Sequence, residues 1–413
     1  MPDIRDRDYL VENWQFDPHI YSQDELFTLY IYMLEKLGIF DTYDIPKANL
    51  INFCRAISKN YRKNPYHNFQ HAFDVAQMCF KLVYKTKAME YLTTSDLLIL
   101  LLSALCHDTD HPGLNNNFQI NDNTHLALIY NDQSVLENHH ASRSFYIMNT
   151  PENNIFANFD EQSYREVRKG VVTSILATDM AQHFELMSKF TTHLNMQPFS
   201  NKNADSRQLL LNVILHIADI SNVSRPWDIA KRWSDLVLEE FLHQGDLEKE
   251  KDLLISPYMD RNNTDQPKMS LGFIDYMVLP MFTALKKILP EINEAVETIH
   301  KNRAIWAERA ENEITVEQVM EDFKRDSPSP ESERSDSTPR SNSSDGKSRR
   351  GTPSTSLSLF QTHLSAPPKK AKPPMLKSHS LPGKQISHEH ESELVKINTE
   401  KKKKSNLPVI NGR

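Results

Sequence analysis

The stretch LLILLLSALCHDTDH, residues 97–111, decides the fold. Its apolar part is far shorter than the ~20 residues that a membrane span requires, so it predicts a buried helix, which we expect Ser95 or Asp96 to cap. The helix then ends in four ionisable side chains within five residues. Placing these groups at the edge of an apolar core would cost folding free energy unless a cation compensated their charge. An exposed end with solvated charges is the alternative, but carboxylates are disfavoured at a helix C-terminus. The pattern therefore indicates a metal site.

Two other segments carry the same kinds of ligand. His67 and His71 in HNFQHAFDV are four residues apart and share one helical face, although such a pair alone is often only core or capping histidines. Asp219 lies in the apolar run LLLNVILHIADISN, where the alternative is a salt bridge to Arg225 or Lys231. Together with His107 and Asp108, these residues offer enough nitrogen and carboxylate ligands for a two-metal site, which is typical of enzymes that break phosphate esters.

Composition narrows the class of protein. The chain has 413 residues and a net charge of −7, but residues 326–413 carry 16 basic and 9 acidic residues, so residues 1–325 have a net charge of −14. An acidic body of this kind argues against nucleic acid as a partner. Only 9 glycines are present, which favours helices over a loop-rich β fold.

An all-α fold is predicted, a compact multi-helix domain over residues 1–325. Ser22 and Glu25 form a capping box ahead of one helix, and Asp44 with Pro46 is expected to begin another. Further helical patterns cover 228–243 and 274–321, the second with a break at Pro290.

Residues 326–413 form a Ser/Pro/Lys-rich tail that we expect to be disordered. The run Lys401–Lys404 could act as a nuclear address or simply as a solubilising cluster. The body has three cysteines, an odd number in apolar segments, and residues 1–10 lack the apolar core of a signal peptide. We therefore expect a cytoplasmic protein without disulfides or a membrane span.

Several motifs in order resemble one family: YHNFQHAFDV, LCHDTDHPGLNN, YNDQSVLENHH, LATDM, HIADIS, FLHQGD and GFIDYMVLP. They are similar to the catalytic domain of the class I 3',5'-cyclic nucleotide phosphodiesterases, which are HD-type metallohydrolases, over roughly residues 10–310. The segments FDPHIYSQDEL and NFCRAISKNYRKNPYHNFQH look most like the high-affinity cGMP-specific family 9. The resemblance implies metal-dependent hydrolysis of cyclic nucleotides to 5'-monophosphates, with cGMP favoured and cAMP as a further substrate, which would end cyclic nucleotide signalling.

The resemblance also implies a role for each matching residue. The first metal, Zn²⁺, would be held by His71, His107, Asp108 and Asp219. Asp108 would also bridge to a second metal, Mg²⁺ or Mn²⁺, whose other ligands would be mostly water. Water around the second ion would be held by His111, Glu137, His140 and Thr178. His67 would be the general acid that protonates the leaving oxygen, because it lies one helical turn from a ligand without being one. Tyr66 and Asn115 would shape the phosphate end of the site.

The implied base pocket departs from the family at one position. Phe273 and Val237 match the two walls that hold the purine, and three more residues match neighbouring positions: Asn222, Phe241 and Tyr258. Each of these could equally be a core residue of an amphipathic helix. Ser270 stands where the family has a purine-binding glutamine, and Gln266 lies four positions too early.

Without an amide that forms two hydrogen bonds to the purine, the free energy of binding the base would be weaker by roughly 1–3 kcal/mol. Three interpretations follow: the enzyme accepts both cAMP and cGMP, it binds the base through Asn222 and a shifted Gln266, or its substrate is not a usual purine cyclic nucleotide.

Two other functions remain as alternatives. One is another HD-type phosphohydrolase, which would act on non-cyclic phosphates. The other is a non-catalytic module that binds nucleotide or a partner protein, against which the intact His67 and the full ligand set count. Among partners, the sequence predicts a cyclic nucleotide substrate and leaves room for a homodimer.

Overall fold

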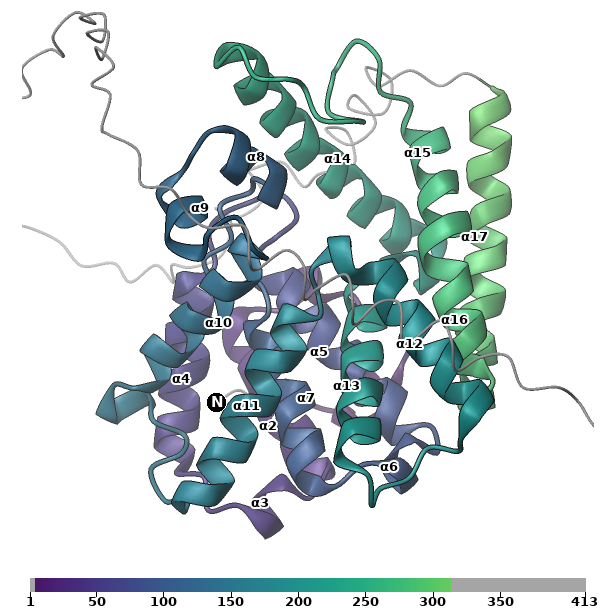
Figure 1. Ribbon diagram of the computed structural model, residues 1–413. Coiled ribbons are helices and arrows are strands. Elements are labelled where there is room, and N and C mark those ends of the chain that lie inside the picture. Colours follow the sequence, from purple (N-terminus) through teal and green to yellow (C-terminus); the bar gives the residue numbers. More distant parts are fainter. Residues whose placement is uncertain (1–3, 313–413) are drawn as a thin grey trace, which may run out of the picture. The chain divides into compact units, whose positions relative to one another are not determined.

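In the computed structural model, residues 4–312 are described, and they fall within one compact unit of the chain. These residues are helical and include no strand, which confirms the predicted all-α fold (Figure 1). The first half of the described chain contains α1 (Arg7–Glu12), η1 (Pro18–Ile20), α2 (Gln23–Lys36), α3 (Ile39–Thr42), α4 (Lys47–Asn60), α5 (Phe69–Tyr84), α6 (Ala88–Tyr91), α7 (Thr94–Cys106), α8 (Asn116–Asn121), α9 (His125–Tyr130), α10 (Val135–Met148) and η2 (Pro151–Asn153).

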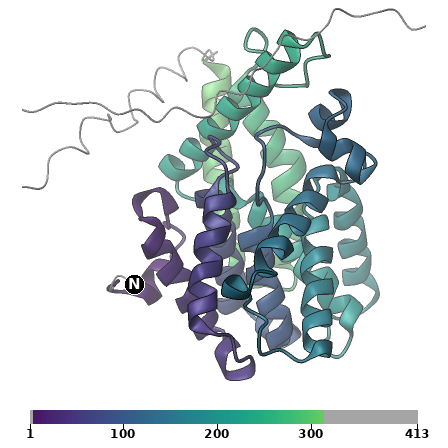
Figure 2. The ribbon, with the colours of Figure 1, turned by 90° about the vertical axis from the view of Figure 1, so that its left-hand side faces the viewer.

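The second half continues with helices of widely different length. They are α11 (Glu161–Leu176), η3 (Met180–Gln182), α12 (His183–Met196), α13 (Ala204–Asp219), η4 (Ser221–Ser224), α14 (Trp227–Glu250), α15 (Gln266–Phe273), the π-helical turn η5 (Ile274–Val278), α16 (Leu279–Lys286), η6 (Pro290–Ile292) and α17 (Asn293–Glu311). In Figure 1, α14 lies above the bundle that contains α5 and α7, and α17 runs down one side along α15 and α16, which it contacts. Figure 2 shows the molecule after a quarter turn, with the green C-terminal helices reaching the top.

Helix α7 is the buried helix that the sequence predicted. All residues from Asp96 to Cys106 are buried, and α7 packs against α5, α11 and α13. Its N-terminal cap differs from the expectation of Ser95 or Asp96. The cap is Thr93, whose hydroxyl accepts from the backbone N–H of Asp96, while the Asp96 carboxylate accepts from the N–H of Thr93 at 2.7 Å. Asp96 is thus the third residue of the helix and completes a capping box.

The other helix boundaries partly match the sequence. Ser22 and Glu25 form the predicted capping box of α2. Helix α4 begins at Lys47 after Pro46, but Asp44 does not cap it; its carboxylate instead accepts a hydrogen bond from Asn158. The amphipathic stretch predicted at 228–243 extends to 24 residues as α14.

The C-terminal helical region is interrupted where Pro290 predicted a break. The segment runs through η5 and α16, turns at η6 and resumes as α17. The predicted end near Glu321, the boundary at 325/326, the tail and Lys401–Lys404 all lie outside the described residues.

All three cysteines, Cys54, Cys79 and Cys106, are buried and unpaired, as expected. Within residues 4–312, no helix combines the length and the apolar character that a membrane crossing demands.

Candidate active site

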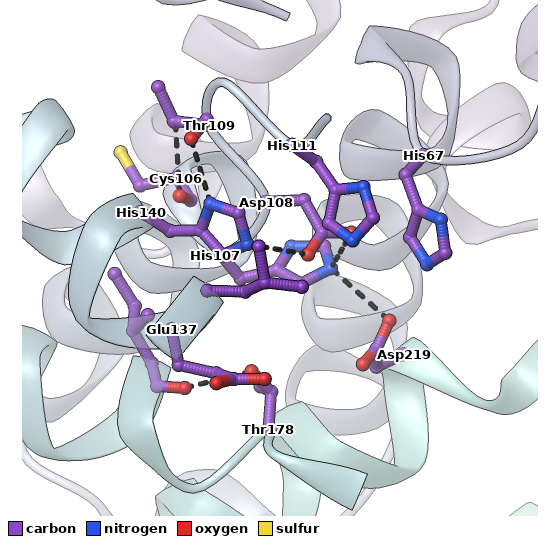
Figure 3. A network of polar contacts seen from close by, with 12 residues as sticks. His67, Cys106, His107, Asp108, Thr109, His111, Glu137, His140, Thr178 and Asp219 are labelled. Atoms are coloured by element: carbon purple, nitrogen blue, oxygen red, sulfur yellow. Dashed lines mark hydrogen bonds and ion pairs between the residues drawn. The ribbon is translucent and has the colours of Figure 1, made fainter. Parts of the chain in front are cut away.

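Four predicted metal ligands converge from the ends of three helices. His71 lies in the first turn of α5, His107 is the C-cap of α7 with Asp108 next to it, and Asp219 is the last residue of α13. One ligand atom from each residue lies within 4.8 Å of the other three. Packing α5, α7 and α13 together therefore gathers side chains from three distant parts of the sequence (Figure 3).

The distances within this cluster are those of groups that share one small space. Nε2 of His107 lies 3.2 Å from Oδ2 of Asp108, 3.2 Å from Oδ1 of Asp219 and 3.3 Å from Nε2 of His71. Nε2 of His71 lies 3.0 Å from the same Asp219 oxygen. Burial would raise the pKa of Asp219, but the imidazoles of His107 and His71 hold that pKa well below its usual range. Two carboxylates and two imidazoles in this arrangement fit a divalent transition-metal ion.

Hydrogen bonds behind the imidazoles orient them toward the cluster. Nδ1 of His107 donates to the backbone oxygen of Ala104 at 2.8 Å, so the lone pair of Nε2 faces the carboxylates. His140 is oriented in the same way by the backbone oxygen of Thr109, also at 2.8 Å, and its Nε2 lies 3.6 Å from Asp108. These bonds select the tautomer that a metal ligand or a water-holding imidazole requires.

A second ring of predicted residues lines a cavity of about 490 Å³ beside Asp108 and Asp219; its members are His111, Glu137, His140 and Thr178. Burial lowers the pKa of His140 to about 4 and that of His111 well below its usual range, so both imidazoles are neutral near pH 7. Burial, with the nearby Asp179 carboxylate, raises the pKa of Glu137 to about 7. Figure 3 shows these side chains projecting around one shared space.

The orientation of His111 depends on a glycine. The N–H of Gly113 donates to Nδ1 of His111 at 3.0 Å, and Gly113 has a φ of +75°, a conformation that other residues rarely adopt. Nε2 of His111 therefore carries the proton.

His67 lies at the edge of the same cavity and is held by a carboxylate that the sequence analysis missed. Nδ1 of His67 is hydrogen-bonded to Oε1 of Glu240, whose other oxygen accepts from the backbone N–H of His67 at 3.0 Å. The ring stacks on His111 with centroids 4.0 Å apart. Burial alone would lower the pKa of His67, but the Glu240 carboxylate outweighs it and raises the pKa to about 9. The raised pKa favours the protonated imidazole at pH 7, which is the form that a general acid requires.

The structure does not adopt the salt bridges considered for Asp219. Arg225 pairs with Asp74 at 2.8 Å, and Lys231 pairs with Asp235 at 2.7 Å. The partners of Asp219 are the two imidazoles of the cluster.

Asp110 is the ionisable member of the HDTDH run whose partners lie away from the cluster. Its carboxylate pairs with Arg62 at 2.8 Å and with His139 at 2.9 Å. The expectation that a cation compensates all four ionisable groups of this run is therefore wrong for Asp110, which finds its partners within the protein.

A smaller cavity of about 130 Å³ adjoins the first, and Phe241 lines both. Its wall contains five of the predicted base-pocket residues together with Tyr66: Asn222, Val237, Phe241, Ser270 and Phe273. The remaining lining residues are Val223, Ala230, Trp233, Ser234, Met269 and Trp306. A mostly apolar slot beside a candidate two-metal cluster suits a flat base attached to a phosphate.

A sequence model of the 3'5'-cyclic nucleotide phosphodiesterase family matches residues 66–299. This segment contains the cluster, His67, the larger cavity and every residue that lines the smaller cavity except Trp306. This chain belongs to that family. Among the family's members, 3',5'-cyclic-nucleotide phosphodiesterase regA of Dictyostelium discoideum is 41% identical over 303 residues, which are 73% of this chain and 38% of regA. The high affinity cGMP-specific 3',5'-cyclic phosphodiesterase 9A of Homo sapiens is 39% identical over 279 residues, 68% of this chain and 47% of that protein.

Solved phosphodiesterase structures agree with the fold. The phosphodiesterase domain of the RhoPDE fusion protein from the choanoflagellate Salpingoeca rosetta superposes with a TM-score of 0.70 at 34% identity, covering 74% of this chain and 99% of that one. The chain spans less than half the length of regA and of the human 9A protein.

The departure from the family at Ser270 is visible in the base pocket. The Ser270 hydroxyl lies 3.2 Å from that of Ser234. Gln266 does not take over the missing role, because it is buried and its amide nitrogen donates to Asp235 at 2.9 Å and to Ser234 at 3.1 Å. The idea that a shifted Gln266 binds the base is therefore wrong: this side chain does not line the cavity.

The other polar residues predicted for substrate contact are engaged with protein partners. The Tyr66 hydroxyl donates to Oδ1 of Asn222 at the base pocket. Asn115 caps α8 and exchanges two hydrogen bonds with the amide of Gln244, at 2.9 and 3.0 Å, beside the larger cavity. Tyr258 is not brought into either cavity, since its side chain is 61% exposed.

Sequence analysis missed Glu240, Trp233 and Ser234, all on α14, and Trp306 on α17. A usable signal existed for Glu240, which lies three residues after Val237 on the face of the amphipathic helix that carries the predicted wall. An acidic side chain on that face, buried to 3% exposure, indicates a specific partner.

Proposed function

We propose that this chain hydrolyses 3',5'-cyclic nucleotides to 5'-nucleoside monophosphates and so ends cyclic nucleotide signals. The observation that carries the proposal is the position of the protonated His67 beside the cluster of His71, His107, Asp108 and Asp219, with an apolar slot adjoining. Membership of the phosphodiesterase family supports it. In the reaction, one water loses a proton to the solvent and its oxygen forms a new bond to phosphorus, the bond from phosphorus to O3' breaks, and O3' receives a proton from His67, which solvent then reprotonates.

Each group of residues has a separate task in this proposal. His71, His107, Asp108 and Asp219 would hold the metal ions, which when bound would activate the water and neutralise phosphate charge. His111, Glu137, His140 and Thr178 would hold water on the far side of Asp108. His67 would give its proton to O3', and Glu240 would keep it protonated and oriented.

The remaining predicted substrate contacts belong to the same proposal. Tyr66 and Asn115 would border the phosphate end. The base would lie between Phe273 and Val237, within a wall that Asn222, Phe241 and Ser270 complete. Tyr258 is left out of the proposed pocket because of its position.

The identity of the metals, the cellular location, the domain boundary and the oligomeric state are also proposals. We infer Zn²⁺ for the first site from its mixed imidazole and carboxylate ligands, and Mg²⁺ or Mn²⁺ for the second, which metal analysis of the purified chain would test. The three unpaired thiols suit a cytoplasmic protein, and Lys401–Lys404 would direct it to the nucleus if it acts as an address. A catalytic domain over 1–325 and a homodimer stay predictions, which limited proteolysis and sedimentation would check.

The test is initial-rate hydrolysis of cGMP and cAMP by the full chain, with Mg²⁺ and with EDTA. We expect turnover of at least one nucleotide that EDTA abolishes and added metal restores. Phosphate monoesters and non-cyclic diesters serve as control substrates. Turnover of these controls without turnover of either cyclic nucleotide would point to another phosphohydrolase, and inactivity toward all of them with metal bound would contradict an enzymatic role.

A further inference from the structure

Asp74 and Arg225 form a buried ion pair next to the base pocket. The side chains of Asp74 on α5 and Arg225 are both 0% exposed, and Nη2 of Arg225 donates to Oδ1 of Asp74 at 2.8 Å. The same guanidinium donates to Oε1 of Gln77 at 2.7 Å. Two buried charges are costly, and a well-packed apolar pair often serves stability as well. Stability is therefore a weak explanation for this pair.

The second oxygen of the Asp74 carboxylate contacts a residue of the base pocket. Nδ2 of Asn222 donates to Oδ2 of Asp74 at 3.3 Å, while Oδ1 of Asn222 accepts from the Tyr66 hydroxyl. Arginine is always protonated, so the carboxylate paired with it can only accept hydrogen bonds. The amide of Asn222 must therefore turn its nitrogen toward Asp74 and its oxygen toward Tyr66.

The two serines at this pocket do not have a fixed hydrogen-bonding polarity. Ser234 and Ser270 present hydroxyls, each of which can donate or accept a hydrogen bond. Trp233 also lines this cavity, but its Nε1 is buried and has no hydrogen-bond partner. A rotating hydroxyl can donate to a purine carbonyl or accept from a purine amine about equally well, whereas an amide of fixed orientation cannot.

We propose that Asp74 and Arg225 are positioning residues that set the orientation of the Asn222 amide and thereby determine how strongly the enzyme distinguishes guanine from adenine. The inference rests on the proposed function, since it concerns base selection at the same site. Asn222 touches the base, and the ion pair acts through it. With Ser270 in place of glutamine, Asn222 supplies the one side-chain amide among the residues that line the described cavity.

The direct test is Asp74→Asn in the full chain. The new amide offers either an oxygen or a nitrogen, so Asn222 can turn both ways. Selectivity is measured as the ratio of kcat/KM for the preferred purine to that for the other, using cGMP and cAMP. We expect this ratio to move toward one by about three- to tenfold, mainly through KM, because His67 and the metal ligands are unchanged.

A double-mutant cycle separates positioning from general structural damage. In the Asn222→Ala background, Asp74→Asn should leave the purine ratio where Asn222→Ala alone puts it. Arg225→Lys keeps the positive charge and should retain most of the wild-type ratio. If Asp74→Asn does not fold because Arg225 is left without a partner, combining it with Arg225→Gln removes both charges and tests the same point.

Asp96→Asn is the matched control. Asp96 forms another largely buried ion pair, with Arg207 at 2.7 Å, on α7 and α13 rather than at the base pocket. The Asp96→Asn variant should be less stable than the wild type, but its ratio of kcat/KM values for the two purines should be unchanged. The proposal is overturned if Asp74→Asn keeps the wild-type ratio, if Asp96→Asn shifts the ratio equally, or if the effect persists without the Asn222 amide.

Equilibrium binding distinguishes this proposal from the proposed function. If the wild-type chain hydrolyses neither nucleotide, the proposed function fails, and the ratio of dissociation constants for cGMP and cAMP decides the positioning role in the same variants. A wild-type chain that binds neither nucleotide, or both equally, would overturn the positioning role as well.

Discussion

Oε1 of Glu240 is hydrogen-bonded to Nδ1 of His67, a residue 173 positions earlier in the chain. The second oxygen of Glu240 accepts from the backbone N–H groups of both His67 and Tyr66. One buried carboxylate on α14 thus fixes both the ring and the backbone of the proposed acid. It also supplies the negative charge that keeps the ring protonated.

The first prediction concerns the pH dependence of Glu240→Gln. A general acid must carry its proton, so activity is lost as pH rises through the pKa of His67, which Glu240 raises to about 9. Replacing the carboxylate by an amide removes that attraction while burial still lowers the pKa. We therefore expect the alkaline limb of the kcat/KM profile to move to lower pH by about 1 to 2 units.

Glu239→Gln is the control for this experiment, since Glu239 is the adjacent acid on the same helix. It should leave the alkaline limb in place. A Glu240→Gln profile that coincides with that of the wild type would show that His67 does not supply the proton, or that Glu240 does not govern its pKa.

The second prediction is that Asp219→Ala loses metal and activity together. Oδ1 of Asp219 lies 3.0 Å from His71 and 3.2 Å from His107, so its removal leaves two imidazoles and one carboxylate. Loss of residues that merely support metal ligands costs about 10- to 100-fold, and loss of a ligand should cost at least about 100-fold in kcat. Metal content, measured on the same sample, should fall in parallel.

Asp228→Ala is a suitable comparison, because Asp228 is an exposed acid in the first turn of α14. It should retain metal and activity. Normal metal content in Asp219→Ala would contradict the ligand assignment.

The fold was predictable where the signals are local. The apolar run of α7 and the pair Ser22 and Glu25 each specify a helix within a few residues of sequence. The cap of α7 was misplaced by two to three residues, because Asp96 serves as the third helical residue and not as the cap. Asp96 also pairs with Arg207, 111 positions away, and no local pattern shows such a contact.

The site was predictable where its motifs place several histidines and aspartates next to an apolar helix. Imidazoles and carboxylates at the end of an apolar helix indicate a metal on their own, so His107 and Asp108 could be assigned from sequence. Helical periodicity could place Glu240 on the buried face of its helix, but it could not pair Glu240 with His67, because the two residues are 173 positions apart and meet only through packing. The partner of Asn222 was likewise invisible, since Asp74 comes from a different helix.

The third prediction is that Ser270→Gln tightens binding of one purine. A glutamine there would add an amide to a pocket whose nearby polar groups are the hydroxyls of Ser234 and Ser270. We expect KM for that nucleotide to fall by about tenfold, with kcat little changed. Ser270→Ala removes the hydroxyl without adding volume and should alter KM much less. Identical KM values for cGMP and cAMP in wild type and Ser270→Gln would place Ser270 outside the binding site.

The fourth prediction tests the cap of α7 through stability. Thr93→Ala removes the hydroxyl that accepts from the N–H of Asp96 and should destabilise the protein by about 0.5 to 2 kcal/mol, measured by urea unfolding. Ser95→Ala provides the contrast, because the buried hydroxyl of Ser95 has no hydrogen-bond partner and its loss should be neutral or slightly stabilising. A larger loss of stability in Ser95→Ala than in Thr93→Ala would place the cap at Ser95. Comparing the two losses of stability therefore decides which residue caps the helix that carries His107 and Asp108 at its other end.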